Sequence, residues 1–359
     1  MIVKKKRFPV FYAVYFTLIF LFFIALAVVL HVVRTYLADY ESAQPQYEAQ
    51  RVFDAYYASG DYTALLEASE VAVSPLETKD TVLRYLREVT DGKKITYTSI
   101  TTGLDSDIKY IVKADDVKFS SFTLTESDAT TEKGFTLYKP SSFEVYVAGT
   151  ESITVTAPLS YTVYVNGVAL DASFLTGSKK DDISCQHMPE GVNGIVFAEY
   201  KADKLYFAPE SIKILTPDGR ECPLAQDETG IYSTGILYDE ALQAEYSEYV
   251  ISAAQALAAY MQNDGKFSTA AAYMDPDSEL YINTRTAETY FVIDHSSYSF
   301  EDVRTSEFCR YDDNTFSCRV SFTHVLKRYG SKDYKDYIDT TFFLRRVGDK
   351  FLIYDRYNH

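Results

Sequence analysis

The residues whose spacing best indicates chemistry between two side chains are the cysteines. The chain has four, and Cys309 and Cys318 flank the segment RYDDNTFS. If a hairpin turn is centred on its Asp-Asn dipeptide, the two cysteines face each other on paired strands. Their Cβ atoms would then be about 4.5–5.5 Å apart, close to disulfide distance. This spacing predicts a Cys309–Cys318 disulfide, with two free buried thiols as the alternative. Cys185 and Cys222 are the remaining disulfide candidates, provided that the compartment is oxidising.

Few other residue spacings match known catalytic or metal-binding motifs. Ser106 and Lys109 match S-x-x-K, the nucleophile spacing of penicillin-binding enzymes. The companion S-D-N and K-T-G motifs are missing, and so short a match arises readily by chance. The sequence contains no Gly-rich phosphate loop, H-E-x-x-H or G-x-S-x-G motif. It also contains no CxxC motif or Cys/His cluster, so we expect neither a metal site nor a cofactor.

The N-terminal region predicts a membrane anchor. Residues 9–33 are almost uninterruptedly apolar, and about 25 helical residues exceed the roughly 30 Å of bilayer hydrocarbon. The residues that set its topology are basic and precede it: Lys4, Lys5, Lys6 and Arg7. By the positive-inside rule, residues 1–8 form a cytoplasmic tail, residues 9–34 a transmembrane helix and residues 35–46 a polar linker. A cleaved signal peptide is the alternative, but its apolar region spans only about 7–15 residues.

The charge beyond the anchor is strongly acidic. Residues 1–34 hold five of the 35 basic residues and none of the 51 acidic ones, which leaves 30 basic against 51 acidic residues in the rest. Such a surface repels phosphate backbones, so we expect no nucleic-acid partner.

The hydrophobic pattern divides the remainder into three segments. In residues 47–150 helical periodicity comes first, and Ser74 with Glu77 has the capping-box spacing of a further helix. The period then changes to 2, which predicts strands at 95–101, 116–124, 135–138 and 143–147. Residues 151–236 predict a small all-β module, with type I′ hairpin turns at Asn166-Gly167 and Asp218-Gly219.

Residues 237–359 repeat the order of the first segment. Helices are predicted at 239–263, 270–273 and 287–293, and strands follow at 300–310, 315–328, 337–346 and 351–357. The turn YYASGDY of the first segment parallels YMQNDGKF here, with one inserted residue. The sequence therefore predicts an α+β chain with a repeated helix-then-sheet unit on either side of the β module.

These turns resemble the NTF2-like (nuclear transport factor 2-like) fold, a cystatin-like α+β roll. The likeness is best where ALAAYMQNDGKFSTAAAYM leads into YSFEDVRTSEFCRYDDNTFSCRVSFTHVL. The whole arrangement is similar to membrane-anchored envelope proteins of Gram-positive bacteria. These include the TcaA-like proteins and the extension domain of resistance-type transpeptidases. TcaA-like proteins usually begin with a zinc ribbon, whereas this chain has no cysteine before Cys185. The resemblance implies two NTF2-like rolls flanking the β module.

The resemblance also points to acid–base candidates. His324 shares strand parity with Phe316, Val320 and Phe322, so its side chain is expected to face the helices, where NTF2-like folds hold their pocket. Enzymes of that fold pair an inward carboxylate or histidine with a tyrosine, which makes His324 with Asp294 or His295 the constellation to test. Alternatively, His324 is a hydrogen-bonded core histidine, and Asp294 and His295 only end a helix.

Three functions are consistent with these observations. The leading hypothesis is a non-catalytic, membrane-anchored protein of the bacterial cell envelope that binds a cell-wall polymer, a peptide or an envelope protein. The second is an NTF2-fold enzyme using acid–base chemistry in the C-terminal roll, and the third is a structural spacer.

Overall fold

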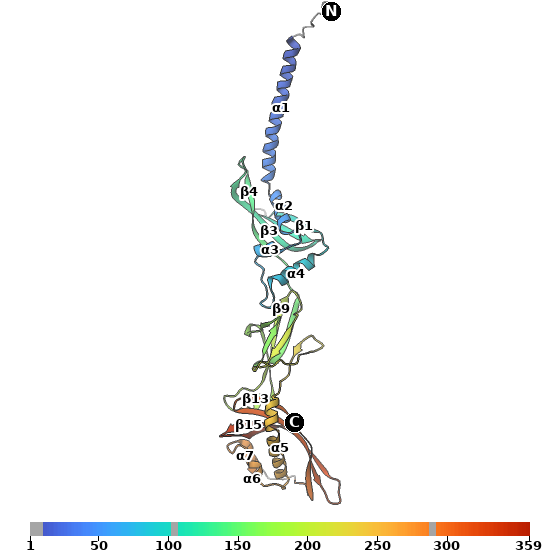
Figure 1. Cartoon of the computed structure of the whole chain (residues 1–359), viewed down its shortest axis with the longest axis vertical. Helices are drawn as coiled ribbons and strands as arrows, with labels where there is room; N and C mark the ends of the chain where they lie inside the picture. The colour runs from blue at the N-terminus through green and yellow to red at the C-terminus, as the bar shows by residue number, and fades with distance from the viewer. Residues whose placement is uncertain (1–9, 102–106, 287–291) are drawn as a thin grey trace, which may run out of the picture. The chain divides into compact units, whose positions relative to one another are not determined.

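The computed structural model describes residues 10–101, 107–286 and 292–359 and has mixed α+β architecture (Figure 1). The chain divides into two compact units. One comprises Met1–Glu151 with Asp203–Ala208, and the other comprises Ser152–Ala202 with Pro209–His359. Ser106 and the basic cluster of residues 4–7 lie outside the described residues.

Helix α1 (Val10–Ser42) is the one described helix that is long and apolar enough to cross a membrane, and none of its residues is buried. It continues past the predicted end at residue 34, so the linker expected at 35–46 is mostly helical. The rings of Tyr36 and Tyr40 each lie 5.2 Å from that of Phe135, and Asp39 accepts a 2.9 Å hydrogen bond from the Lys133 amide. These contacts explain why the helix continues.

Three helices follow α1 and precede a sheet: α2 (Pro45–Tyr56), α3 (Thr63–Ala68) and α4 (Lys79–Thr90). The capping box predicted at Ser74 and Glu77 is wrong. Helix α4 is capped by Thr78, whose side chain exchanges hydrogen bonds with Thr81, while the Glu77 carboxylate accepts the amide of Tyr206. A carboxylate used in this long-range contact is unavailable to cap a helix.

The sheet of this region is an antiparallel meander in the order β1-β2-β3-β4, among the described residues. Its strands are β1 (Ile95–Thr101), β2 (Ile108–Ala114), β3 (Val117–Thr130) and β4 (Thr136–Val145). The sequence pattern did not identify β2, and it divided β4 into two strands. We refer to Pro45–Val145 as the first helix–sheet unit.

The predicted β module contains β5 (Glu151–Pro158), β6 (Thr162–Val165), β7 (Val168–Ala169), β8 (Leu175–Asp181), β9 (Val196–Leu205), β10 (Ile212–Leu215), β11 (Ala225–Gln226) and β12 (Tyr232–Ser233). Asn166 and Gly167 both have positive φ, as the predicted type I′ turn requires. At the second predicted turn only Gly219 does, with Thr216 accepting its amide, so that turn is not type I′. Short 3-10 helices cover Ala172–Phe174 and Ile183–Gln186.

The C-terminal region again places helices before a meander sheet. Its helices are α5 (Glu240–Met261), α6 (Phe267–Ala271) and α7 (Glu279–Thr286), and its strands are β13 (Ser297–Asp312), β14 (Thr315–Lys327), β15 (Tyr334–Val347) and β16 (Lys350–Asn358). Asp239 caps α5 by accepting the Leu242 amide, and α5 packs against β13 and β14. The helix expected at 287–293 falls largely on residues outside the described part. We call Glu240–Asn358 the second helix–sheet unit.

Candidate functional site

His324 is a core residue of the second helix–sheet unit. Its side chain is 0% exposed, and neither ring nitrogen has a hydrogen-bond partner. The ring lies 4.8 Å from that of Phe300 and 5.5 Å from that of Tyr298, between centroids. Burial lowers the pKa of His324 because the charged imidazolium would lose its hydration. A neutral ring without a partner is poorly placed to transfer a proton.

His295 and Asp294 do not complete a constellation with His324. The Nδ1 of His295 lies 2.5 Å from the Ile293 carbonyl oxygen, and its Nε2 lies 2.8 Å from the Asp264 carboxylate. The Ile293 carbonyl raises the pKa of His295 most, and Asp264 raises it further. Because both partners only accept hydrogen bonds, they favour the protonated ring. His295 thus connects the segment before β13 to the end of α5, and Asp294 is exposed.

The four cysteines are all free, so neither predicted disulfide is formed. The pairing of β13 with β14 shifts register between Arg310 and Asp312, which places Cys309 opposite Ser317 instead of Cys318. Cys318 then lies on the helix-facing side of the sheet, within the core, and Cys309 on the other side. Burial raises the pKa of the Cys309 thiol to about 12, which keeps it protonated and unreactive at neutral pH.

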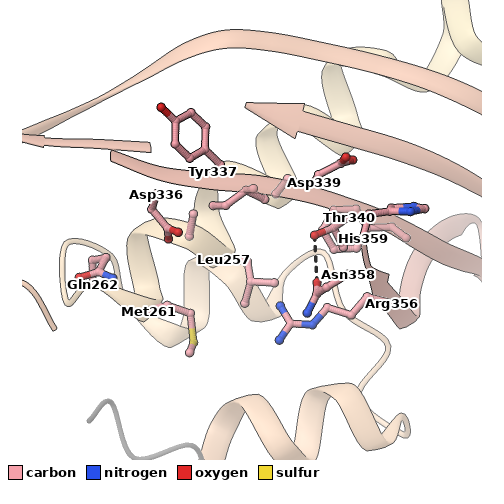
Figure 2. Close-up of a pocket in the computed structure, with 14 residues that line it drawn as sticks. Leu257, Met261, Gln262, Asp336, Tyr337, Asp339, Thr340, Arg356, Asn358 and His359 are labelled. Atoms are coloured by element: carbon pink, nitrogen blue, oxygen red, sulfur yellow. Dashed lines mark hydrogen bonds between the residues drawn. The ribbon is translucent and has the colours of Figure 1, made fainter. Parts of the chain in front are cut away.

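A cavity of about 430 Å³ lies between α5 and the last two strands of the second helix–sheet unit (Figure 2). Alanines on α5 leave this space open, because Ala254 and Ala258 stand where larger side chains would reach the sheet. The lining residues are Ala254, Leu257, Ala258, Met261, Gln262, Asp336, Tyr337, Ile338, Asp339, Thr340, Phe342, Arg356, Asn358 and His359. Asn358 accepts a 3.0 Å hydrogen bond from the Thr340 hydroxyl.

Arg356 is the cation of this cavity. It lies opposite Phe342 on the paired strands, which places it on the helix-facing side of the sheet. Its guanidinium makes no hydrogen bond or ion pair with any described residue, and desolvation lowers its pKa although Asp355 opposes this. The Asp355 carboxylate itself contacts Nδ1 of His187 at 2.7 Å. Arg356 is therefore a partly buried charge without a bonded counterion.

Two carboxylates also border the cavity, and they differ in their partners. Asp339 is held by Arg319, with N–O distances of 2.7 and 2.6 Å. Asp336 lies opposite His324 on the paired strands, and its carboxylate bonds to no described residue. Figure 2 shows Asp336 and Arg356 approaching Leu257 from opposite sides. The cavity thus presents two unpaired opposite charges separated by apolar surface.

Sequence reasoning missed both charges, for different reasons. Simple alternation along β16 would put Arg356 on the side away from Phe351 and Ile353, but a register shift between Phe343 and Leu344 reverses its direction. Nothing in the sequence locates that irregularity. The position of Asp336 could have been predicted, because alternation along β15 places it on the same inward face as Ile338 and Phe342. A charged residue at such a position marks either a strand end or a site.

Comparisons with known proteins add little to this geometry. No family model and no curated protein matches the chain. Among solved structures, the chain is similar to an "Ntf2 like protein involved in plasmid conjugation", with 12% identity and a TM-score of 0.23. This match covers 82% of this chain and 93% of that one. Within the described residues, no group of three or more His, Cys, Asp or Glu side chains is arranged to hold a metal ion.

Proposed function

We propose that this chain is a membrane-anchored, non-catalytic binding protein of the bacterial cell envelope, of the Gram-positive type that the sequence resembles. The α1 helix would anchor it, with the basic residues 4–7 in the cytoplasm and the remaining chain outside the cell. Both helix–sheet units would be NTF2-like rolls. The ligand or partner, a wall polymer, a peptide or an envelope protein, would bind at the C-terminal roll.

One observation carries this proposal: the cavity between α5 and the strands β15 and β16 is open and lined by unpaired charges and apolar groups. Ligand sites are typically concave, largely apolar, and supplied with a few polar groups that fix orientation. A spacer has no need of such a cavity. An acid–base enzyme would need His324 exposed to the cavity and hydrogen bonded, whereas it is fully buried, does not line the cavity and has no bonded partner among the described residues.

The experiment for binding uses the full chain in its own membrane. A photo-crosslinking residue at Met261, which lines the cavity from α5 and is half-buried, should capture an envelope component in cells. The same residue at Tyr329, 97% exposed in the β14–β15 connection, is the matched control. Equal capture at both positions, or none at Met261, would count against a site at this cavity.

Topology needs its own test. External protease added to intact cells should digest the chain beyond α1 and leave the N-terminal tail. If the bulk of the chain is protected until the cells are lysed, the envelope location is wrong and the proposal fails with it.

A further inference from the structure

The cavity contains an arginine whose charge is not balanced by any bonded partner among the described residues. A charge removed from water costs free energy unless a partner compensates it, so proteins rarely keep one without a use. Arg356 has a lowered pKa from desolvation and no ion pair among the described residues. Arg356 therefore has the properties of a group that binds an anion.

The neighbouring carboxylates do not take that place. Asp355 contacts His187 and points to the other side of the sheet, opposite Phe343. Asp339 is bound by Arg319 through two hydrogen bonds. Glu279 lines an adjoining hollow of about 370 Å³ together with Arg356, but it is exposed and does not pair with it. Each carboxylate near Arg356 is thus engaged, turned away or solvated.

The other end of the cavity has the opposite character. Asp336 has no bonded partner among the described residues, and His295, which like Asp336 lies near His324, is bound to Asp264. A free anion would enter a chain of formal net charge −16 against repulsion. A ligand that carries both charges avoids this repulsion and satisfies both groups.

We propose that the cavity binds a zwitterion, with its carboxylate on Arg356 and its ammonium group on Asp336. This inference rests on the proposed function, which it deepens by naming the ligand class. A planar guanidinium binds a carboxylate through two parallel hydrogen bonds, and the two oxygens of a carboxylate can accept hydrogen bonds from an ammonium group. Leu257, Ile338 and Phe342 lie between the charges and contact the aliphatic or peptide part of the ligand.

The positions of the two charges set the length of the ligand. Asp336 and Phe342, the strand partner of Arg356, are six residues apart on β15, about 20 Å between Cα atoms. The Arg356 side chain shortens this span because it extends toward Leu257 (Figure 2). An α-amino acid is too short to bridge it. The ligand class is therefore an ω-amino acid or a short peptide with a free amine and a free carboxylate.

The experiment measures binding of ω-amino acids of increasing chain length to the full chain in detergent, by isothermal titration calorimetry. Affinity should pass through a maximum at one length. At that length the fatty acid and the alkylamine lacking one charge should bind at least about tenfold more weakly. Arg356→Met should weaken zwitterion binding by at least about tenfold, and Asp336→Asn by about threefold or more. Arg328→Met and Asp349→Asn, at exposed positions, are the matched controls.

A folding check accompanies each variant. If Arg356 served packing, Arg356→Met would lower the melting temperature, whereas a binding role predicts an unchanged or higher one. Inorganic phosphate that competes as well as the zwitterion would overturn the inference in favour of a simple anion site. So would equal binding by Arg356→Met and the parent protein, or an absence of any length optimum. If no probe binds while the crosslinker at Met261 still captures an envelope component, the zwitterion is wrong and the proposed function stands.

Discussion

In the first helix–sheet unit, aromatic rings fill the space between helices and sheet, whereas the corresponding space of the second contains a cavity. Tyr57 and Phe122 are at most 1% exposed, and Phe122 stacks on Tyr110 with 5.0 Å between ring centroids. In the second unit, α5 instead presents Ala254 and Ala258 toward the sheet. The same order of elements thus gives one interior packed with aromatic rings and another that retains a cavity.

A hollow in the first unit makes the difference clearer. It has a volume of about 550 Å³ and is lined by Pro45, Gln46, Tyr97, Thr98, Ser99, Ile108 and Tyr110, none of them charged. The smaller cavity of the second unit carries Arg356 and Asp336. Volume alone therefore does not distinguish these two hollows; charged side chains do. We infer a mainly structural role for the first unit and a binding role for the second.

The largest expected effect comes from emptying the filled interior. Phe122→Ala should destabilise the first unit by about 3–5 kcal/mol, because it leaves a void among packed rings. Leu257→Ala in the second unit should cost about 2 kcal/mol, since Leu257 already borders open space. Segment-resolved hydrogen exchange of the full chain measures each loss locally. Equal losses in both units would contradict the distinction between filled and open interiors.

The reverse change, adding volume, sharpens the comparison. Ala258→Phe should fill the cavity, abolish ligand binding and change stability by less than about 1 kcal/mol. Ala49→Phe, at a 0% exposed position on α2, should cost about 1–3 kcal/mol because no space is available. Thermal unfolding and calorimetric binding measured on both variants give the answer. Strong destabilisation by Ala258→Phe would mean that α5 lies closer to the sheet than the cavity implies.

The sequence predicts the long helices and strands, but not the features that depend on how distant segments pair. The helix at 239–263 and the four C-terminal strands were predicted within a few residues of α5 and β13–β16, because their periodicity is long and strong. Strand β2 was missed, since the burial of residues 108–114 is continuous and not alternating. The Cys309–Cys318 disulfide was predicted wrongly and the direction of Arg356 was missed for one reason: each depends on a register irregularity in a strand.

Acid should affect the two units differently. The first helix–sheet unit contains no histidine, whereas the second contains His295 and His324. The pKa of His324 is lowered on folding, so its unfolded form takes up a proton first as pH falls below about 6.5. Stability is therefore lost at up to about 1.4 kcal/mol per pH unit below that value. Hydrogen exchange between pH 7 and pH 5 should show this loss in β13–β15 only.

Substitution separates the two histidines. His324→Leu should remove the acid sensitivity, since burial opposes protonation of His324 and leucine does not titrate. The pKa of His295 is raised, so its contribution is complete below about 6.5 and is lost as pH rises through its folded pKa. His295→Gln should therefore reduce stability at pH 5.5 more than at pH 8. A parallel acid loss in the first unit would show that histidine is not the cause.

The smallest expected effect concerns how the first unit meets the anchor. Phe135, in the connection between β3 and β4, contacts Tyr36 and Tyr40 of α1 edge-on. Such aromatic pairs contribute about 0.5–1.5 kcal/mol beyond burial, so Phe135→Ala should loosen residues 36–42 by about that amount without unfolding the sheet. Hydrogen exchange of this helical segment in detergent measures the change. Phe135→Tyr, which keeps the ring, should restore protection. If protection of residues 36–42 is the same in all three proteins, α1 holds its own helical extension, and the first unit contributes nothing to it.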